Sequence, residues 1–118
     1  MSALTLGTVP SSFVIEHLPH ATLPEDDDWI ALVRAPEGLT VVRDATPWTE
    51  AEPWTGLYVT GPHLDVPGPL AAVTALLADA DVPVFAVSTF HGDLILTPER
   101  LAKTVTDALE SAGHRVLS

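Results

Sequence analysis

In the second half of the chain, the spacing of apolar residues predicts strands and helices that follow one another along the sequence. Residues 56–61 have strand composition and end at a Gly-Pro step, and residues 84–96 form two apolar runs around a tight polar turn. Leu70, Val73, Leu76 and Leu77 recur at helical spacing, as do apolar residues in 101–112. A last strand is expected at 114–117. The predicted order is β-α-β-β-α-β, the ferredoxin-like plan, with two helices on one face of an antiparallel sheet.

The second predicted helix has clear signals at both of its ends. Thr97-Pro98-Glu99 combines a hydroxyl cap, proline at the first helical position and an acid facing the positive end of the helix dipole. Gly113 is a typical C-terminal cap. We therefore expect Thr97 to cap the helix, Pro98 to begin it and Gly113 to follow its end.

The first half of the chain contains fewer predicted elements. Residues 13–18 indicate a strand, residues 19–28 an acidic connection, and residues 29–34 and 39–43 a hairpin. This order repeats the second half with its helices lost. The sequence therefore predicts an α+β protein with a diverged, helix-poor half at 1–55 and a full unit at 56–118, sharing a sheet or packed side by side. Trp29, Trp48 and Trp54 are expected in the core and between the halves.

Composition narrows the range of partners. The 118 residues carry a formal net charge of -11 with five Lys and Arg residues, which argues against binding to nucleic acid or to an anionic membrane surface. The chain has no cysteine, so disulfides and thiolate chemistry are excluded. Pro, Gly and charged residues interrupt every apolar stretch before it reaches bilayer length. A cytoplasmic protein is the expectation.

Polar side chains gather at the turn between the two apolar runs. Ser88, Thr89, His91 and Asp93 lie where the chain reverses, and such turns on a rigid scaffold often bind ligands. The Asp93 carboxylate could accept hydrogen bonds from a ligand ammonium or guanidinium group. The other interpretation is ordinary turn chemistry, in which the acid caps local amides.

Catalytic and metal-binding patterns are weak. No nucleophile elbow surrounds any serine, and no glycine-rich phosphate loop is present. His17, His20 and the acids of 25–28 do not match a known metal-site spacing, so a solvated loop is favoured over a metal site. We expect no enzymatic activity, no metal and no cofactor.

Two segments resemble a known family. Residues 71–93, which include the core Ser88-Thr89-Phe90-x-x-Asp93, look like the small ACT-domain proteins related to aspartate kinase regulatory domains and to the cytosolic arginine sensors. Residues 29–42 are similar to the family's first hairpin, and the resemblance covers about 13–116. It implies an ACT fold and a free amino acid bound between ACT units.

The resemblance and the residues together indicate a ligand site. The turn would supply Thr89, Phe90, His91 and Asp93, and the loop before the first helix would supply Asp65, Val66 and Gly68. That loop ends at a helix N-terminus, whose free N–H groups suit a carboxylate. Phe90, Val66 and Leu94 would form its walls. The loop departs from the family pattern, because it is shortened and its usual hydroxyl residues are replaced by Val66, Pro67, Gly68 and Pro69. The two prolines also remove donors.

The sequence therefore favours a non-catalytic, amino-acid-binding regulatory protein that forms homo-oligomers. Because the protein is so acidic, arginine or lysine is a better candidate ligand than aspartate or glutamate. The alternative is a protein-interaction module with a vestigial pocket, whose acidic surface meets a basic partner. A small ferredoxin-like enzyme is the least favoured class.

Overall fold

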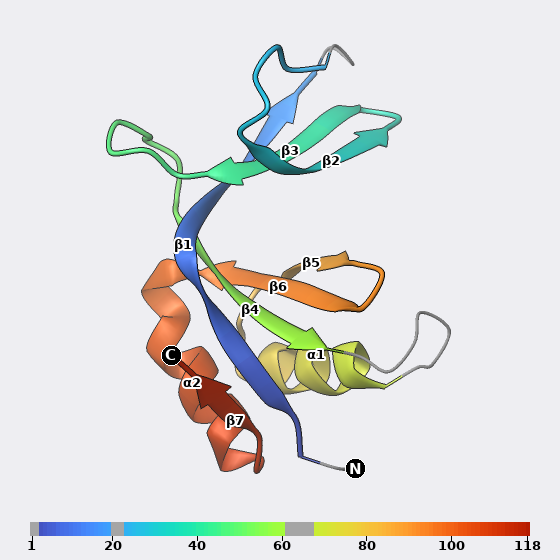
Figure 1. The fold of residues 1–118 in the computed structure, drawn as a ribbon. Helices are drawn as coiled ribbons and strands as arrows, with labels where there is room; N and C mark the ends of the chain where they lie inside the picture. The colour runs from blue at the N-terminus through green and yellow to red at the C-terminus, as the bar shows by residue number, and fades with distance from the viewer. Residues whose placement is uncertain (1–2, 20–22, 61–67) are drawn as a thin grey trace.

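The computed structural model describes residues 3–19, 23–60 and 68–118, and in these residues it shows one sheet with two helices on one face (Figure 1). The strands are β1 (Thr5–Leu18), β2 (Trp29–Ala35), β3 (Gly38–Asp44), β4 (Trp54–Thr60), β5 (Phe85–Ser88), β6 (Gly92–Pro98) and β7 (Arg115–Leu117). The helices are α1 (Pro69–Asp79) and α2 (Ala102–Ser111), the latter preceded by a 3₁₀ turn, η1 (Glu99–Leu101). The predicted α+β class, with its antiparallel sheet and two helices, is confirmed.

The strand order departs from a self-contained β-α-β-β-α-β unit. The elements from β4 to β7 follow one another along the chain in that order, but the sheet runs β2-β3-β1-β4-β6-β5. The last strand, β7, pairs with β1 in parallel, with Thr5 opposite Arg115 and Gly7 opposite Leu117. A strand from the first half therefore lies inside the sheet of the second half, because β1 separates β7 from β4.

Strand β1 joins the two halves because it is long and irregular. Its first part, Gly7 to Val9, pairs with β4, and its second part, Phe13 to Leu18, pairs with β3. The register on β4 shifts between Val9 and Ser12, where the bulge contains Pro10 and Ser11. Proline cannot donate a ladder hydrogen bond, so a bulge is a favourable place for it.

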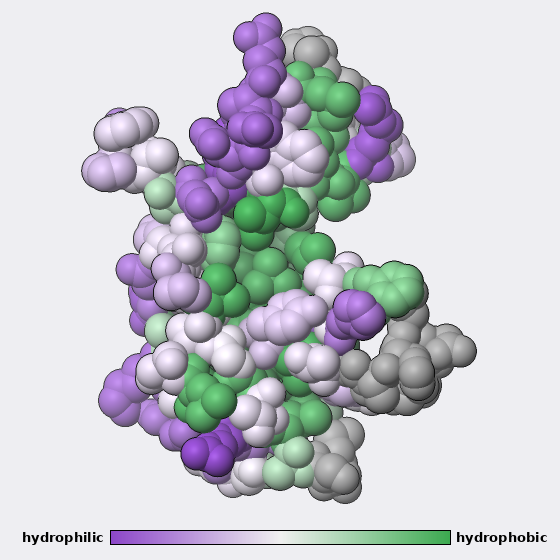
Figure 2. Space-filling model, in the orientation of Figure 1, coloured by the Kyte–Doolittle hydropathy of each residue, from purple (hydrophilic) through white to green (hydrophobic). Residues whose placement is uncertain are grey.

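The sheet buries side chains on both faces. The main core lies between the sheet and the helices, and its buried residues are Leu6, Leu57, Val59, Val73, Leu77, Val82, Ile95, Val105 and Leu109. A smaller cluster of Phe13, Val42 and Leu96 lies on the opposite face. Ile95 and Leu96 point to opposite faces, as alternation along a strand requires. Figure 2 shows apolar surface near this smaller cluster, between the β2–β3 hairpin and β5–β6.

Both helices end in the same hydrogen-bonded motif. At the end of α1, Val82 N donates to Leu77 O (2.9 Å) and Asp81 N to Ala78 O (3.0 Å). At the end of α2, His114 N donates to Leu109 O and Gly113 N to Glu110 O, both at 3.0 Å. These are the paired bonds of a Schellman motif, which needs a positive φ at its penultimate position. Gly113 (φ 92°) was predicted for this role, whereas Asp81 (φ 59°) was not.

The predicted start of the second helix is wrong. Thr97 is a buried strand residue that pairs with Thr55, the 3₁₀ turn begins at Glu99, and its cap residue is Pro98. No side-chain hydrogen bond caps this turn within the part of the chain that the structure describes. The pairing of β6 with β4 continues through Pro98 and overrides the local capping signal.

The predicted positions of the tryptophans are also largely wrong. Trp48 is 80% exposed and Trp29 is 37% exposed. Trp54 alone follows the expectation, since it is half-buried against the cluster of Phe13, Val42 and Leu96. The connection between β3 and β4 carries Trp48 outward on a turn that the Thr46 and Thr49 side chains close, with their hydroxyls 2.7 Å apart.

Candidate functional site

The turn between β5 and β6 is held by the side chain of Thr89. Thr89 N donates to Gly92 O (2.8 Å), and Gly92 N donates back to the Thr89 hydroxyl (3.1 Å). The Tyr58 hydroxyl lies 2.8 Å from the same Thr89 oxygen. Thr89 therefore shapes the turn, so a ligand would share its hydroxyl with these partners.

Tyr58 is the contact that the sequence did not predict. It lies on β4, opposite Leu94, and its hydroxyl reaches the turn on the neighbouring hairpin. A β-strand tyrosine paired with an apolar residue gives no local sign of this role.

Asp93 lies at the start of β6 and is bound by Ser88. The Ser88 hydroxyl donates to Asp93 Oδ1 (2.8 Å), and the two residues are register partners on β5 and β6. Asp93 is half-buried, and alternation places it on the helix-bearing face together with Ile95. Its carboxylate therefore points toward the side of the sheet where the helices lie.

The end of β4 lies beside Asp93. Val59, the penultimate residue of β4, is the register partner of Asp93, and Thr60 pairs with Gly92. The loop then begins. Asp65 and Val66 lie outside the described residues, but Gly68 is described: it is the N-cap residue of α1, with φ 148°. The turn and the end of β4, which the predicted loop follows in the sequence, are therefore neighbours in the sheet.

Two predicted pocket walls do not fit this arrangement. Leu94 packs against the cluster on the face opposite Asp93, so it cannot wall a pocket centred on that carboxylate. Phe90 is 71% exposed, and its ring meets the His91 ring edge-on with centroids 4.8 Å apart. Phe90 and His91 form a projecting aromatic pair at the tip of the turn.

An open cleft of about 600 Å³ lies beside Trp48. Its lining includes Glu16, Arg43 and Glu50, and Arg43 is already paired with Glu16 and Asp26. In the described residues no group of three or more His, Cys, Asp and Glu side chains could hold a metal ion. His20 lies outside those residues.

The fold and the turn can now be compared with known proteins. The family model of the ACT domain matches residues 50–111, which is more than half of the 118 residues and includes β4, α1, the β5–β6 turn and all of α2. The chain belongs to the ACT-domain family. ACT domains are typically regulatory, small-molecule-binding and non-catalytic. The matched region begins after the β2–β3 hairpin, and it includes Ser88, Thr89 and Asp93.

Two solved structures have the same fold as this ACT-domain protein. A protein of Agobacterium tumefaciens superposes with a TM-score of 0.82 at 24% identity, over 99% of this chain and 94% of that one. A Vibrio cholerae protein, described as of unknown function and as a possible transport protein, superposes with a TM-score of 0.71 at 20% identity. The match covers 88% of this chain and 85% of that one. No functionally curated protein matches the sequence. The hairpin and β1 thus belong to an arrangement found in other chains.

The helices of this ACT-domain protein are short. Within the described residues, no helix has the length and apolar character needed to cross a bilayer.

Proposed function

We propose that this ACT-domain protein is a non-catalytic regulatory protein that binds a free amino acid between the β5–β6 turn and the start of α1. The supporting observation is the position of Asp93: a half-buried carboxylate, oriented by Ser88, beside the end of the strand that leads into α1. An amino acid carries an ammonium group and a carboxylate, so its site needs one anionic and one cationic partner. Asp93 supplies the first.

The start of α1 supplies the second partner. No side chain of a described residue caps this end, and the first turn contains no acidic residue. The first N–H groups of a helix lack partners within the helix and favour a negative charge. Pro69 has no N–H group, so the free backbone N–H groups nearest the start of the helix belong to Leu70 and Ala71. A ligand carboxylate would be stabilised there.

A basic amino acid fits the charge of the protein best. The formal net charge of -11 attracts cations and slows the approach of anions. The resemblance of residues 71–93 to the cytosolic arginine sensors points the same way, and Asp93 corresponds to the acid of their ligand pocket. We therefore favour arginine or lysine.

Self-association completes the proposal. ACT domains typically oligomerise, and β2 and β5 are the two outer strands of the main sheet path. A small domain buries a limited fraction of its surface, so a second copy adds stability. Residues 1–55, as a diverged ACT-like half, would place a second unit beside the first within each chain.

Calorimetry with each free amino acid tests the proposal. Asp93→Ala should weaken binding roughly ten- to a hundredfold, because a charge-assisted hydrogen bond is worth about 1.5–3 kcal/mol. Asp79→Ala, which removes an exposed carboxylate at the other end of α1, should leave the affinity unchanged. Equal losses in both variants would show a general charge effect and contradict a site at Asp93.

The alternative function is a protein-interaction module that meets a basic partner through its acidic surface. No thermal stabilisation by any free amino acid, at low or moderate salt, would favour it over the sensor. Selective stabilisation by aspartate or glutamate would still support an amino-acid-binding sensor, but it would refute the preference for a basic ligand.

A further inference from the structure

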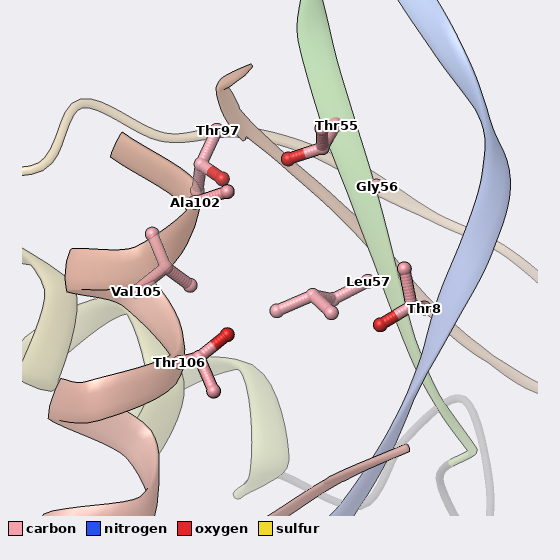
Figure 3. A pocket seen from close by; sticks show the side chains of 8 residues that line it. All are labelled: Thr8, Thr55, Gly56, Leu57, Thr97, Ala102, Val105 and Thr106. Atoms are coloured by element: carbon pink, nitrogen blue, oxygen red, sulfur yellow. The ribbon is translucent and has the colours of Figure 1, made fainter. Parts of the chain in front are cut away.

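A second cavity lies on the helix-bearing face, between α2 and the strands β1, β4 and β6 (Figure 3). Its volume is about 100 Å³. It is lined by Thr8, Thr55, Gly56, Leu57, Thr97, Ala102, Val105 and Thr106. None of these residues belongs to the amino-acid site proposed above.

The cavity is lined by hydroxyl groups from four different elements. Thr8, Thr55 and Thr97 come from the three strands, and Thr106 comes from α2. Figure 3 shows their oxygens directed into the space between α2 and the sheet. Thr97 is 1% exposed, whereas Thr8 is an exposed residue, so the cavity extends from an open side inward to Thr97.

These four hydroxyls have no hydrogen-bond partner among the residues that the structure describes. Thr74 on α1 shows the usual alternative, because its hydroxyl donates to Leu70 O (2.9 Å) one turn earlier. Among the described residues, Arg43 Nε is the one fully buried side-chain polar atom without a partner, so the threonine hydroxyls keep accessible surface in the cavity. A ligand there could supply the hydrogen bonds that buried polar groups almost always make. The Thr97 hydroxyl, which the Thr-Pro-Glu sequence suggested as a helix cap, is instead available to the cavity.

Among the described residues, none that lines the cavity has a charged side chain. Leu57, Ala102 and Val105 supply apolar surface between the hydroxyls. An ion placed here would lose its hydration without gaining an opposite charge, which is strongly unfavourable. The lining therefore suits an uncharged molecule with hydroxyl or amide groups and a short carbon backbone.

The cavity is separated from Asp93. Asp93, Ile95 and Thr97 share one face of β6, and Ile95 between them is fully buried in the main core. Four residues along a strand correspond to roughly 13 Å. The two sites can therefore be occupied and tested independently.

We propose that this threonine-lined cavity is a second ligand site, which takes a small uncharged molecule with hydroxyl or amide groups. The volume of about 100 Å³ has room for roughly three waters, or for a solute of about four non-hydrogen atoms. The solute would donate to and accept from Thr97 at the inner end and from Thr55 and Thr106 along the sides.

Methyl NMR of the full chain tests the site. Glycerol, ethylene glycol and acetamide are the probes, and glycerate is the charged counterpart of glycerol. We expect saturable shifts of the Leu57, Ala102 and Val105 methyl groups with at least one neutral probe, and none with glycerate. Uniform, non-saturating shifts with all three neutral probes, or equal binding of glycerate, would overturn the proposal.

Matched variants locate the binding. Thr97→Val keeps the side-chain shape and removes the hydroxyl, so it should weaken probe binding at least tenfold. Thr106→Val is the second variant, and Thr104→Val, on the exposed side of α2, is the control. Asp93→Ala should leave probe binding unchanged, which separates this site from the amino-acid site. Unchanged affinity in both Thr97→Val and Thr106→Val would refute the assignment.

Discussion

The Ser88 hydroxyl donates a 2.8 Å hydrogen bond to Oδ1 of Asp93 across the β5–β6 pair. This contact restricts the carboxylate to one orientation and occupies one of its oxygens. Oδ2 remains for a ligand cation. Ser88 thus acts on the proposed amino-acid site by positioning Asp93.

Removing that contact should weaken amino-acid binding without abolishing it. Ser88→Ala leaves the charge of Asp93 intact but frees its rotamer, so we expect about a three- to tenfold loss of affinity by calorimetry, equivalent to about 0.7–1.4 kcal/mol. Ser111→Ala, an exposed serine at the end of α2, is the control. A loss as large as that of Asp93→Ala would mean that Ser88 contacts the ligand directly.

Gly92 should be intolerant of a side chain. A Cβ atom there would overlap Val59 O and would lie 2.8 Å from the Tyr58 hydroxyl. Gly92→Ala is therefore expected to lower the free energy of unfolding by about 2–3 kcal/mol in urea titrations. Gly7→Ala, also in a strand but with nothing within 4 Å of its Cβ position, should cost far less. Equal costs would show that β6 can shift away from β4.

The end of α1 is a place where the protein can be stabilised. Asp81 has φ 59° in the position where the Schellman motif prefers glycine, and its charge lies at the negative end of the helix dipole. Asp81→Gly should raise the free energy of unfolding by about 0.5–1 kcal/mol. Ala80→Gly, one residue earlier with φ -92°, should lower it. A lower free energy of unfolding for Asp81→Gly than for wild type would contradict this prediction.

Arg43 should contribute more to stability than the other arginine ion pairs at the surface. Its Nε lies 2.6 Å from Glu16 Oε1, at an angle that falls short of hydrogen-bond geometry, and a terminal nitrogen lies 2.8 Å from Asp26 Oδ1. Its side chain is 21% exposed, against 63% for Arg100 beside Glu52. We expect Arg43→Gln to lower the free energy of unfolding by about 1 kcal/mol, and Arg100→Gln to lower it by under about 0.5 kcal/mol, in urea titrations.

The contribution of Arg43 should not depend on pH near neutrality. Burial lowers the pKa of Arg43, but the hydrogen bond to Asp26 and the charge of Glu16 outweigh it, so the pKa is raised. A base with a raised pKa stabilises the fold at every pH below its unfolded pKa and loses that effect only in strong alkali. The difference between wild type and Arg43→Gln should stay flat from about pH 6 to pH 9.

Local patterns predicted the elements whose stability is local. The β2–β3 hairpin was found to within one residue at each end, because alternation and Gly38 specify it. The helix α1 followed from the spacing of Leu70, Val73 and Leu77. The start of β1 was missed, since Gly7, Pro10 and two serines look like a loop and only the pairing with β4 and β7 makes them a strand. The prediction that Thr97 caps a helix was wrong for the same reason, because Thr97 is held in a strand by Thr55, which lies far away in the sequence.

The polar turn between β5 and β6 was predictable from the sequence, whereas the contacts that hold it were not. The polar turn stood out, but the two residues that hold it, Tyr58 and Ser88, act through strand register that no local pattern reveals. Leu94 was assigned to the wrong face because the start of β6 was placed without its register. The threonine-lined cavity was not predicted at all, since its four hydroxyls come together only through the packing of α2 on the sheet.

The pairing of β7 with β1 has a consequence for how the protein is made. Translation produces Thr5–Gly7 early, but its parallel partner Arg115–Leu117 is synthesised more than a hundred residues later. At about 5–20 residues per second, the edge of β1 that β7 covers waits several seconds or longer for its partner. That edge is open to pairing with other chains during this interval. The sheet can therefore close only after β7 has left the ribosome.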